Sequence, residues 1–545
     1  MTTDQNNNQK GKYATSFKEQ LTVRGIIIGA IGAVIITTSS MYVALRMGAL
    51  PWPTLFVAIM SMTVLKALKN TNLNEINVTH TIMSAGAMVA GGLAFTVPGI
   101  WMLDKMANVS FVTLLSVTLS GTILGIIFTA LIRAFFVEKE ALPYPMGIAA
   151  YETVMAGDEG GSKSKTLFST LGITAIFTAL RDWFGVIPSA ITFQGLAAKN
   201  IFAGIWVSPM AVGIGYIIGP LFTGVWFLGA VISYFLIIPL GIKFGVFPDV
   251  ATATAFKDSL GIGIMVGTGI GVLLKGILPK AKEIYGPMLS GKAVKEGGVN
   301  MKWAPIGFIL VAFLLTVFTK MGFVSSILVI IGVWLTTAMA ASMTGQSGIN
   351  PMEIFAVIVL IIIKAITQVS GIEAFLVAGV VAIACGLAGD VLNDFKSGYL
   401  LKTDPKAQLI GESIGAIIGA VISVIVLFVM LKAFGAMGPG TDLVAPQAYM
   451  VSTMVGGLPN TSAFIAGLII GIILYFFKVP TTLGLGIYLP MNITAAAAIG
   501  GLISFIVNKV KPENNEKGTI ISSGLLGGEG VTGVIIAIIQ VITMS

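Results

Sequence analysis

The sequence predicts an all-α protein that crosses a membrane many times. Hydrophobic residues make up 56% of the 545 residues, charged residues only 10%, and the mean hydropathy is +0.95. A soluble domain carries about 25% charged residues, so most of this chain cannot face water. Apolar runs of the length that spans a bilayer, about 20 residues, recur throughout, and alternating barrel-type strands do not. We expect about 16 transmembrane helices in two related halves, with re-entrant or broken segments.

Polar stretches divide the chain. Residues 1–20 form a polar tail, and the lysine-rich stretch 279–302 separates a first transmembrane repeat, 21–278, from a second, 303–545. Lysines beside membrane spans are typical of cytoplasmic loops. We therefore expect the tail and the basic linker to be cytoplasmic and the protein to be a multi-pass protein of the cell (inner or plasma) membrane.

An internal duplication is predicted from similar segments. Val212–Tyr234 and Leu483–Phe505, 271 residues apart, share several glycines and a central threonine. Weaker matches pair Thr71 with Thr344 and Pro145 with Pro405. Coincidence is the alternative, because a chain rich in glycine and isoleucine gives such matches by chance. An even number of spans in each half would make the halves parallel, an odd number would invert them, and we favour the parallel arrangement.

Three segments have the features of interrupted helices. Leu142–Gly157 is short and opens with two prolines, Leu489–Ile493 places a proline inside an apolar run, and Gly527–Gly530 places a carboxylate in the last one. Irregular backbone at membrane depth is tolerated where protein buries it or where it lines a wet cavity. Ordinary proline kinks and small-residue packing are the alternative interpretation.

Several functions are excluded or disfavoured by what the sequence lacks. The single cysteine, Cys385, cannot form an intramolecular disulfide, and with the single histidine, His80, it cannot build a Cys/His metal cage. No P-loop or H-E-x-x-H pattern occurs. The net charge of +8 comes from lysines without interleaved aromatic residues, which argues against nucleic-acid binding. We predict no cofactor, no metal and no enzymatic activity, and a transport energy drawn from a gradient.

Carboxylates inside apolar segments are the first candidates for function, because each is costly unless paired or hydrated. Glu152, Glu412 and Glu529 are predicted to couple protons or recognise a cation or amine. Their alternative role is that of helix-end carboxylates at the membrane interface. Arg181 and Asp182 are interpreted as an interfacial pair. We interpret Asp390 and Asp394 as flanking residues of a span. His80 is interpreted as structural, with proton sensing as the alternative.

Polar and aromatic residues near these carboxylates complete the predicted site. Asn77 lies in the turn Thr71–His80, and Gln346 and Asn350 lie in the turn Thr344–Asn350. Such side chains and nearby backbone amides suit a peptide or carboxylate ligand, although plain helix capping is the alternative. The remaining predicted site residues are Tyr144, Tyr151, Tyr488 and Asn492.

Motifs along nearly the whole chain resemble one family. They are LTVRGIIIGA (21–30), NVTHTIMSAGAMVAGGLAFTVPGIW (77–101), LPYPMGIAAYETV (142–154), SPMAVGIGYIIGP (208–220), TGQSGINP (344–351), NDFKSGYLLKTDPKAQ (393–408), LGIYLPMNI (485–493) and SSGLLGGEG (522–530). In this order they resemble the oligopeptide transporter (OPT) family, including its yellow-stripe-like carriers of metal chelates. The resemblance implies proton-coupled transport of oligopeptides or metal chelates by a prokaryotic member. Met146 departs from the family's LPYPEG, where an acidic residue is usual.

The function predicted from these observations is secondary active, proton-coupled transport of small oligopeptides or peptide-like metal chelates. The expected partners are that solute, protons and the lipid bilayer, with a homodimer as the default assembly and no nucleic acid. A passive channel or a non-transporting membrane scaffold is the alternative, followed by an intramembrane enzyme.

Overall fold

The computed structural model describes residues 12–48, 54–158, 162–289, 302–348, 350–369, 371–480 and 482–544. These residues are helical apart from turns and one antiparallel two-stranded sheet, β1 (Ala190–Thr192) and β2 (Gly204–Trp206). Within them, nine helical segments are long and apolar enough to cross a membrane, or up to ten if α22 and α23 form one broken span. The predicted all-α membrane architecture is confirmed. The predicted count of about 16 transmembrane helices is not confirmed, because the further apolar helices among the described residues are only 10–17 residues long.

The helices gather into two compact units. Unit 1 comprises residues 1–164 and 277–451, and unit 2 comprises residues 165–276 and 452–545. Each unit thus draws residues from both predicted halves, whose boundaries stay a prediction. Residues 1–11 of the predicted tail and 290–301 of the predicted linker lie outside the described residues.

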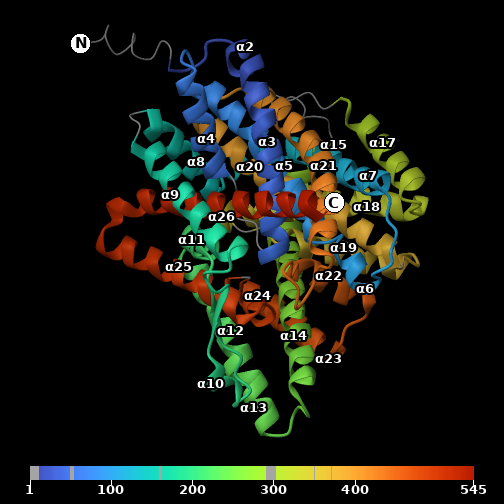
Figure 1. Cartoon of the computed structure of the whole chain (residues 1–545). Helices are drawn as coiled ribbons and strands as arrows, with labels where there is room; N and C mark the ends of the chain where they lie inside the picture. The colour runs from blue at the N-terminus through green and yellow to red at the C-terminus, as the bar shows by residue number, and fades with distance from the viewer. Residues whose placement is uncertain are drawn as a thin grey trace. The chain divides into compact units, whose positions relative to one another are not determined.

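Unit 1 contains most of the longest helices, coloured blue to cyan and yellow to orange in Figure 1. Its elements are α2 (Phe17–Gln20), α3 (Val23–Met47), α4 (Thr54–Ala67), α5 (Leu73–Ala94), α6 (Gly99–Leu103), α7 (Phe111–Arg133) with the π-helical turn η1 (Ala134–Lys139), α8 (Pro145–Asp158), η5 (Leu278–Lys280), α15 (Ala281–Leu289), α17 (Ala304–Phe318), α18 (Phe323–Ser347), α19 (Met352–Ile366), α20 (Gly371–Leu400), α21 (Pro405–Phe434) and the start of α22 (Pro446–Gly456).

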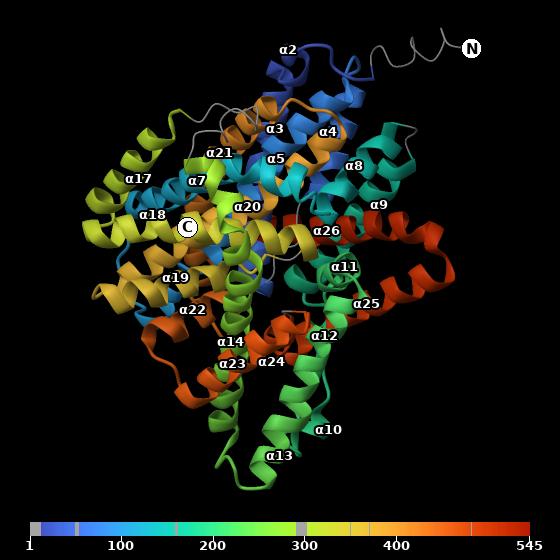
Figure 2. The same ribbon diagram turned by 180° about the vertical axis from the view of Figure 1, so that it is seen from behind.

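Unit 2 is built from the remaining helices and carries the small sheet. Its elements are most of α9 (Ser162–Thr178), η2 (Ala179–Trp183), α10 (Gln194–Ala197), α11 (Pro209–Ile218), α12 (Pro220–Val231), η3 (Ile232–Ile237), α13 (Ile238–Lys243), α14 (Val250–Gly271), η4 (Val272–Ile277), α23 (Thr461–Phe476), α24 (Thr482–Tyr488), α25 (Met491–Val510), η6 (Pro512–Asn514) and α26 (Asn515–Met544). The end of α13 and the start of α14 form the two sides of a hairpin that both views show in green (Figure 1, Figure 2).

Polar residues begin many of these helices. The side chains of Thr22, Asn72 and Ser208 accept hydrogen bonds from the first-turn amides of α3, α5 and α11, which satisfies N–H groups that a helix start leaves free. Asp249 caps α14 in the same way through the amide of Thr252. That bond lowers the pKa of the exposed Asp249 carboxyl.

Two long helices of unit 1 stop at matching glycines. Both α3 and α18 contain 25 residues, and each ends at a glycine in the left-handed conformation, Gly48 (φ 65°) and Gly348 (φ 74°). A proline follows three residues later in both cases, Pro51 and Pro351. A glycine tolerates this conformation and a proline cannot continue the helix, so the sequence itself produces both breaks.

Glycines also bring α5 and α21 into close contact. A Cβ atom built on Gly419 of α21 would lie 2.3 Å from the Cα atom of Gly86 in α5, and one on Gly415 would lie 2.0 Å from the carbonyl oxygen of Ile82. Any side chain there would force the two backbones apart. Small residues at such crossings are a common device of membrane helices.

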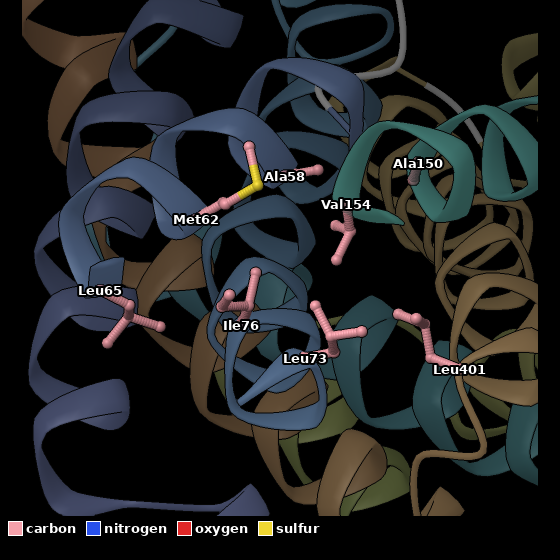
Figure 3. Close-up of a cluster of buried hydrophobic side chains, with 8 residues drawn as sticks. All are labelled: Ala58, Met62, Leu65, Leu73, Ile76, Ala150, Val154 and Leu401. Atoms are coloured by element: carbon pink, nitrogen blue, oxygen red, sulfur yellow. The ribbon is translucent and has the colours of Figure 1, made fainter. Parts of the chain in front are cut away.

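A hydrophobic cluster packs α4, α5 and α8 together (Figure 3). It is formed by Ala58, Met62, Leu65, Leu73, Ile76, Ala150, Val154 and Leu401, all of them buried. Tyr151 and Met155 of α8 pack against it. This cluster fixes the N-terminal part of α5, the helix whose next turns carry the polar residues described below.

The structure corrects three details of the sequence-based expectations. Gly527–Gly530 does not interrupt its segment, because α26 runs unbroken from Asn515 to Met544. Thr71 precedes α5 whereas Thr344 lies inside α18, and Pro145 opens a helix of 14 residues whereas Pro405 opens one of 30. These two pairings therefore join non-equivalent positions.

The interrupted helix at Leu489–Ile493 is present. The helix α24 ends at Tyr488 and α25 begins at Met491, with Pro490 between them. The similar segment in the first half has the same form, because α11 ends at Ile218 and α12 begins at Pro220.

Candidate functional site

Two aspartates of α20 point to the same side of their helix. Asp390 and Asp394 are four residues apart, a spacing that stacks side chains on one face. The most apolar 18-residue stretch of α20 is 100% buried inside the protein. In Figures 1 and 2 this helix runs among the other helices of unit 1. Both aspartates therefore lie in the interior of a predicted membrane span.

Glu412 of α21 joins these two aspartates. One carboxylate oxygen from each of Asp390, Asp394 and Glu412 lies within 4.8 Å of the others, and all three side chains are buried. We call these three residues the acidic cluster. Among the described residues, they form the group of Asp, Glu, His and Cys side chains close enough together to surround one bound ion.

The helix α5 supplies the polar partners of the cluster. His80 Nε2 lies 2.9 Å from Asp394 Oδ1, and the Ser84 hydroxyl donates to Asp394 Oδ2 at 2.5 Å. An ionised carboxylate only accepts, so His80 donates its Nε2–H when Asp394 is charged. By contrast, the oxygens of Asp390 and Glu412 have no hydrogen-bond partner of normal geometry among the described residues.

Three negative charges cannot remain together in this position. Two unit charges about 5 Å apart repel by roughly 3 kcal/mol at an effective dielectric constant of about 20, before the cost of removing each from water is counted. Of the described basic groups, His80 alone is ion-paired with the cluster. This repulsion favours binding of a proton or another cation by the cluster when it is closed to water.

Asn77 lies one turn before His80 but serves helix packing. Its amide nitrogen donates to the Thr403 hydroxyl at 3.3 Å, and its oxygen accepts from the Ser397 hydroxyl at 2.9 Å. These bonds tie α5 to the end of α20 and the turn that follows. Asn74 reinforces the same contact through Thr403 and the carbonyl of Leu401.

The predicted residues of α8 are not brought to the cluster by any described contact. Tyr144 is buried, and its hydroxyl donates to the carbonyl of Ala341 at 3.0 Å. Tyr151 is half-buried against the hydrophobic cluster of Figure 3. The side chain of Glu152 lies outside the described residues.

The turn after α18 separates its two predicted residues. Gln346 is exposed, and its amide donates to the Ser342 hydroxyl at 3.0 Å. Asn350 donates to the carbonyl of Cys385 at 2.7 Å and so anchors the start of α19 to α20. The buried oxygen of Asn350 has no described partner.

Glu529, in unit 2, is saturated with hydrogen bonds. Its carboxylate accepts from Arg181 Nη2 at 2.8 Å, from the Ser208 hydroxyl at 3.0 Å and from the Met210 amide at 2.9 Å. Arg181 also forms a bidentate pair with Asp182, with both distances at 2.7 Å. This group ties α26 and η2 to the start of α11, which favours a structural role for Glu529.

Tyr488 and Asn492 flank the break between α24 and α25. The carbonyl of Tyr488 accepts from Lys257 Nζ at 2.9 Å, and Lys257 also pairs with Asp258 at 2.6 Å. Asn492 lines a cavity of about 330 Å³ together with Tyr234 and Pro490. The ammonium of Lys257 lies 5.1 Å from the centre of the Tyr234 ring. The volume of the cavity beside Asn492 is within the range of about 300–1,000 Å³ that small-molecule sites occupy.

Sequence reasoning found one member of the acidic cluster, Glu412, and missed the others. Asp390 and Asp394 lie toward the end of an apolar run and were interpreted as flanking residues, and His80 as structural. The available signal was their spacing of four residues in GLAGDVLNDF, which places two carboxylates on one helical face. Pairing with His80, 314 residues away in sequence, has no local signal.

Comparison with known proteins gives the family. The model of the family described as "OPT oligopeptide transporter protein" matches residues 20–540. The chain is 25% identical to the "Putative oligopeptide transporter" of Haemophilus influenzae, over 92% of each chain. It is 23% identical to the rice "Probable metal-nicotianamine transporter YSL5", covering 76% of this chain and 73% of the relative. It is 22% identical to the Arabidopsis thaliana "Metal-nicotianamine transporter YSL1", covering 97% and 92%. This match, together with the apolar helices, shows that the chain belongs to the oligopeptide transporter family and is a multi-pass membrane transporter.

Proposed function

We propose that this protein is a secondary active transporter that moves small oligopeptides or peptide-like metal chelates together with protons. The names of its relatives support these two solute classes, because one is called an oligopeptide transporter and others are called metal-nicotianamine transporters. The observation that carries the proton coupling is the acidic cluster, with its three buried carboxylates and a single histidine.

The chemistry of the cluster suits a reversible proton site. When the cluster is closed to water, the repulsion among Asp390, Asp394 and Glu412 favours binding of a proton. When a conformational change hydrates the cluster, water solvates the charged carboxylates and the proton can leave. Opening to opposite sides of the membrane in turn would let a proton gradient drive solute uptake.

The direct test uses purified protein in proteoliposomes. Labelled di- to tetrapeptides and metal chelates are offered with a proton gradient, with an equal sodium gradient and with neither. We expect accumulation above the external concentration only with the proton gradient, and its loss when a protonophore is added. Accumulation with the sodium gradient alone would show instead that transport is coupled to sodium ions.

Glu412→Gln tests the cluster within the same assay. We expect the variant to bind solute and to exchange it across the membrane, but to accumulate at least about tenfold less, because a buried amide cannot release a proton. Glu513→Gln is the matched control, since Glu513 is exposed on η6. Equal accumulation by the wild type and Glu412→Gln would contradict coupling at this carboxylate.

A passive channel is the second candidate function. It predicts flux that follows the solute gradient and never exceeds it, whatever the proton gradient. The same proteoliposomes distinguish the two functions, because only a coupled transporter concentrates solute.

The placement of the protein in the cell is part of the proposal. We place it in the cell membrane with a cytoplasmic N-terminus, two repeats at 21–278 and 303–545 and a homodimeric assembly as the default. Lys18, which is exposed near the N-terminus, supports this orientation.

A further inference from the structure

The three carboxylates of the acidic cluster do not have equal surroundings. Asp394 accepts hydrogen bonds from His80 and Ser84, at 2.9 Å and 2.5 Å. Both oxygens of Glu412 and both oxygens of Asp390 are buried without a partner of normal geometry among the described residues. Glu412 comes from a different helix, is 1% exposed and lies within 4.8 Å of the aspartates, so its unpartnered oxygens face a group that can bind a positive ion.

We propose that the three carboxylates of the cluster have different roles. Asp394 stays ionised as a fixed charge, while Asp390 and Glu412 hold the transported proton between them. His80 is then a positioning residue that keeps Asp394 in place through its Nε2–H. This inference rests on the proposed proton-coupled function and assigns roles within its site.

The physical reason lies in the solvation of each charge. Hydrogen bonds from a protein replace water around a buried carboxylate and make its charged form tolerable. Asp394 has two such donors. The hydroxyls of Ser84 and Thr54 lie near Asp390 without normal hydrogen-bond geometry, and Glu412 has no donor among the described residues. Two close carboxylates without donors of normal geometry are best stabilised by sharing one proton, which forms an O–H bond on one and a hydrogen bond to the other.

The step needs no other reactant. A hydronium ion on one side of the membrane transfers its proton to an oxygen of Asp390 or Glu412 and leaves as water. On the other side a water molecule takes the proton back, and the carboxylate returns to its charged form. No electron moves and no covalent bond other than O–H is formed or broken.

Several other charged groups on the surrounding helices are paired elsewhere or face away. On α5, Glu75 is paired with Arg24, and on α7, Arg133 is paired with Glu138. Lys396 is two residues beyond Asp394, a separation that turns a helix by about 200° and directs it to the other side of α20. The remaining charged residues on helices in contact with α5, α20 and α21 are Lys18, Glu19, Arg46, Lys66, Lys139, Glu152, Asp158, Glu353, Lys364, Glu373, Lys406 and Lys432.

Asparagine and glutamine variants separate the two roles. We expect Asp390→Asn and Glu412→Gln each to lose proton-driven accumulation at every pH between 5 and 8 while retaining solute exchange. Asp394→Asn should still accumulate solute, with its half-maximal pH lowered by about one unit, because the cluster has lost a negative charge that attracts the proton. Each variant is first checked by thermal unfolding in detergent.

His80 is tested with two variants that differ in one bond. Gln can donate an N–H at the position of His80 Nε2, and Leu cannot. We expect His80→Leu to raise the half-maximal pH of uptake by about one unit, because Asp394 then competes for the proton, and His80→Gln to restore most of the wild-type profile. If His80 had only a structural role, its replacement would lower the amount of folded protein. The pH profile of uptake by the protein that still folds would then be unchanged.

A second measurement does not depend on transport. A pH-difference infrared spectrum of the wild type should contain a band from a protonated carboxyl group. The band should disappear in Asp390→Asn and in Glu412→Gln and persist in Asp394→Asn. If any of these variants fails to fold, Asp390→Glu, Glu412→Asp or Asp394→Glu takes its place, and the band should shift in the first two and stay in the third.

The outcomes distinguish this inference from the proposed function. Loss of accumulation in Asp394→Asn with retention in Asp390→Asn or Glu412→Gln would overturn the division of roles and leave proton coupling intact. Equal loss in all three would also overturn it, since Asp394 would then carry the proton too. If the wild type never accumulates solute with a proton gradient, the proposed function itself fails.

Discussion

Buried carboxylates in this protein fall into two kinds, and their hydrogen bonds tell them apart. Glu529 has four hydrogen-bonded contacts, including one from a buried arginine. Glu412 has no partner of normal geometry among the described residues and faces two further carboxylates. The sequence predicted the same role for both, because each appears there as a glutamate inside an apolar run. The difference depends on tertiary partners that local sequence does not reveal.

Replacing Glu529 should therefore destabilise the protein. Glu529→Ala leaves the buried Arg181 without one of its two anions, and breaking a buried ion pair costs about 3–5 kcal/mol. We expect a clearly lower unfolding temperature in detergent, whereas the exposed Glu513→Ala should unfold like the wild type. A stable Glu529→Ala variant that binds solute and fails only to accumulate it would contradict the structural role and return Glu529 to the coupling site.

At the scale of helices, the sequence predicted the type of each element better than the residues at which it begins and ends. Hydropathy predicted the long helices, and prolines predicted the breaks at Pro490 and before α8. The break expected at Gly527–Gly530 is absent, and Gly524 and Gly528 instead bring α26 close to Leu167 and Leu171 of α9. Glycine alone does not distinguish a break from a close crossing.

The order of the helices suggests how the duplication is arranged. Helices α3, α4 and α5 are followed 298–300 residues later by α18, α19 and α20, and α11 and α12 are followed 271–273 residues later by α24 and α25. We propose these pairs as the equivalent elements of the two predicted repeats. A shared offset for the whole chain does not exist, because the intervening loops differ in length.

Close packing of α5 and α21 gives a prediction at the same scale. Gly419→Ala would place a methyl group 2.3 Å from the Cα atom of Gly86, so the helices must shift. Overpacking of this kind costs about 1–3 kcal/mol, which we expect to see as a lower unfolding temperature and, because Glu412 is on α21, as weaker accumulation.

The matched control is Gly172→Ala on α9, where a new Cβ meets nothing within 4 Å. Alanine is the better helix former at both positions by about 1 kcal/mol, so the difference between the variants isolates the contact. Equal stability of the two variants would show that α5 and α21 are not packed this closely.

At the scale of the whole chain, composition predicted the membrane class and motif order predicted the family. The two compact units were not predicted, because each combines segments from both halves and such contacts leave no local pattern. The acidic cluster belongs to unit 1 and the saturated Glu529 to unit 2. Only the former contains unpartnered buried carboxylates close enough together, among the described residues, to surround a single ion.

The orientation of the chain can be tested with thiol chemistry. The native Cys385 is fully buried, so the wild type should resist maleimides while folded. Ser16 is exposed at the start of α2. We expect Ser16→Cys to react in intact cells with a membrane-permeant maleimide and not with an impermeant one. Labelling by the impermeant reagent would place the N-terminus outside the cell.

The position of His80 has a practical consequence for following the transport cycle. It is the single histidine of the 545 residues, and it lies 2.9 Å from a member of the acidic cluster. Isotope labelling of histidine alone would therefore give the resonances of a single imidazole ring in a protein of 56.8 kDa. Those resonances would report each arrival and departure of charge next to Asp394, free of overlap from any other histidine.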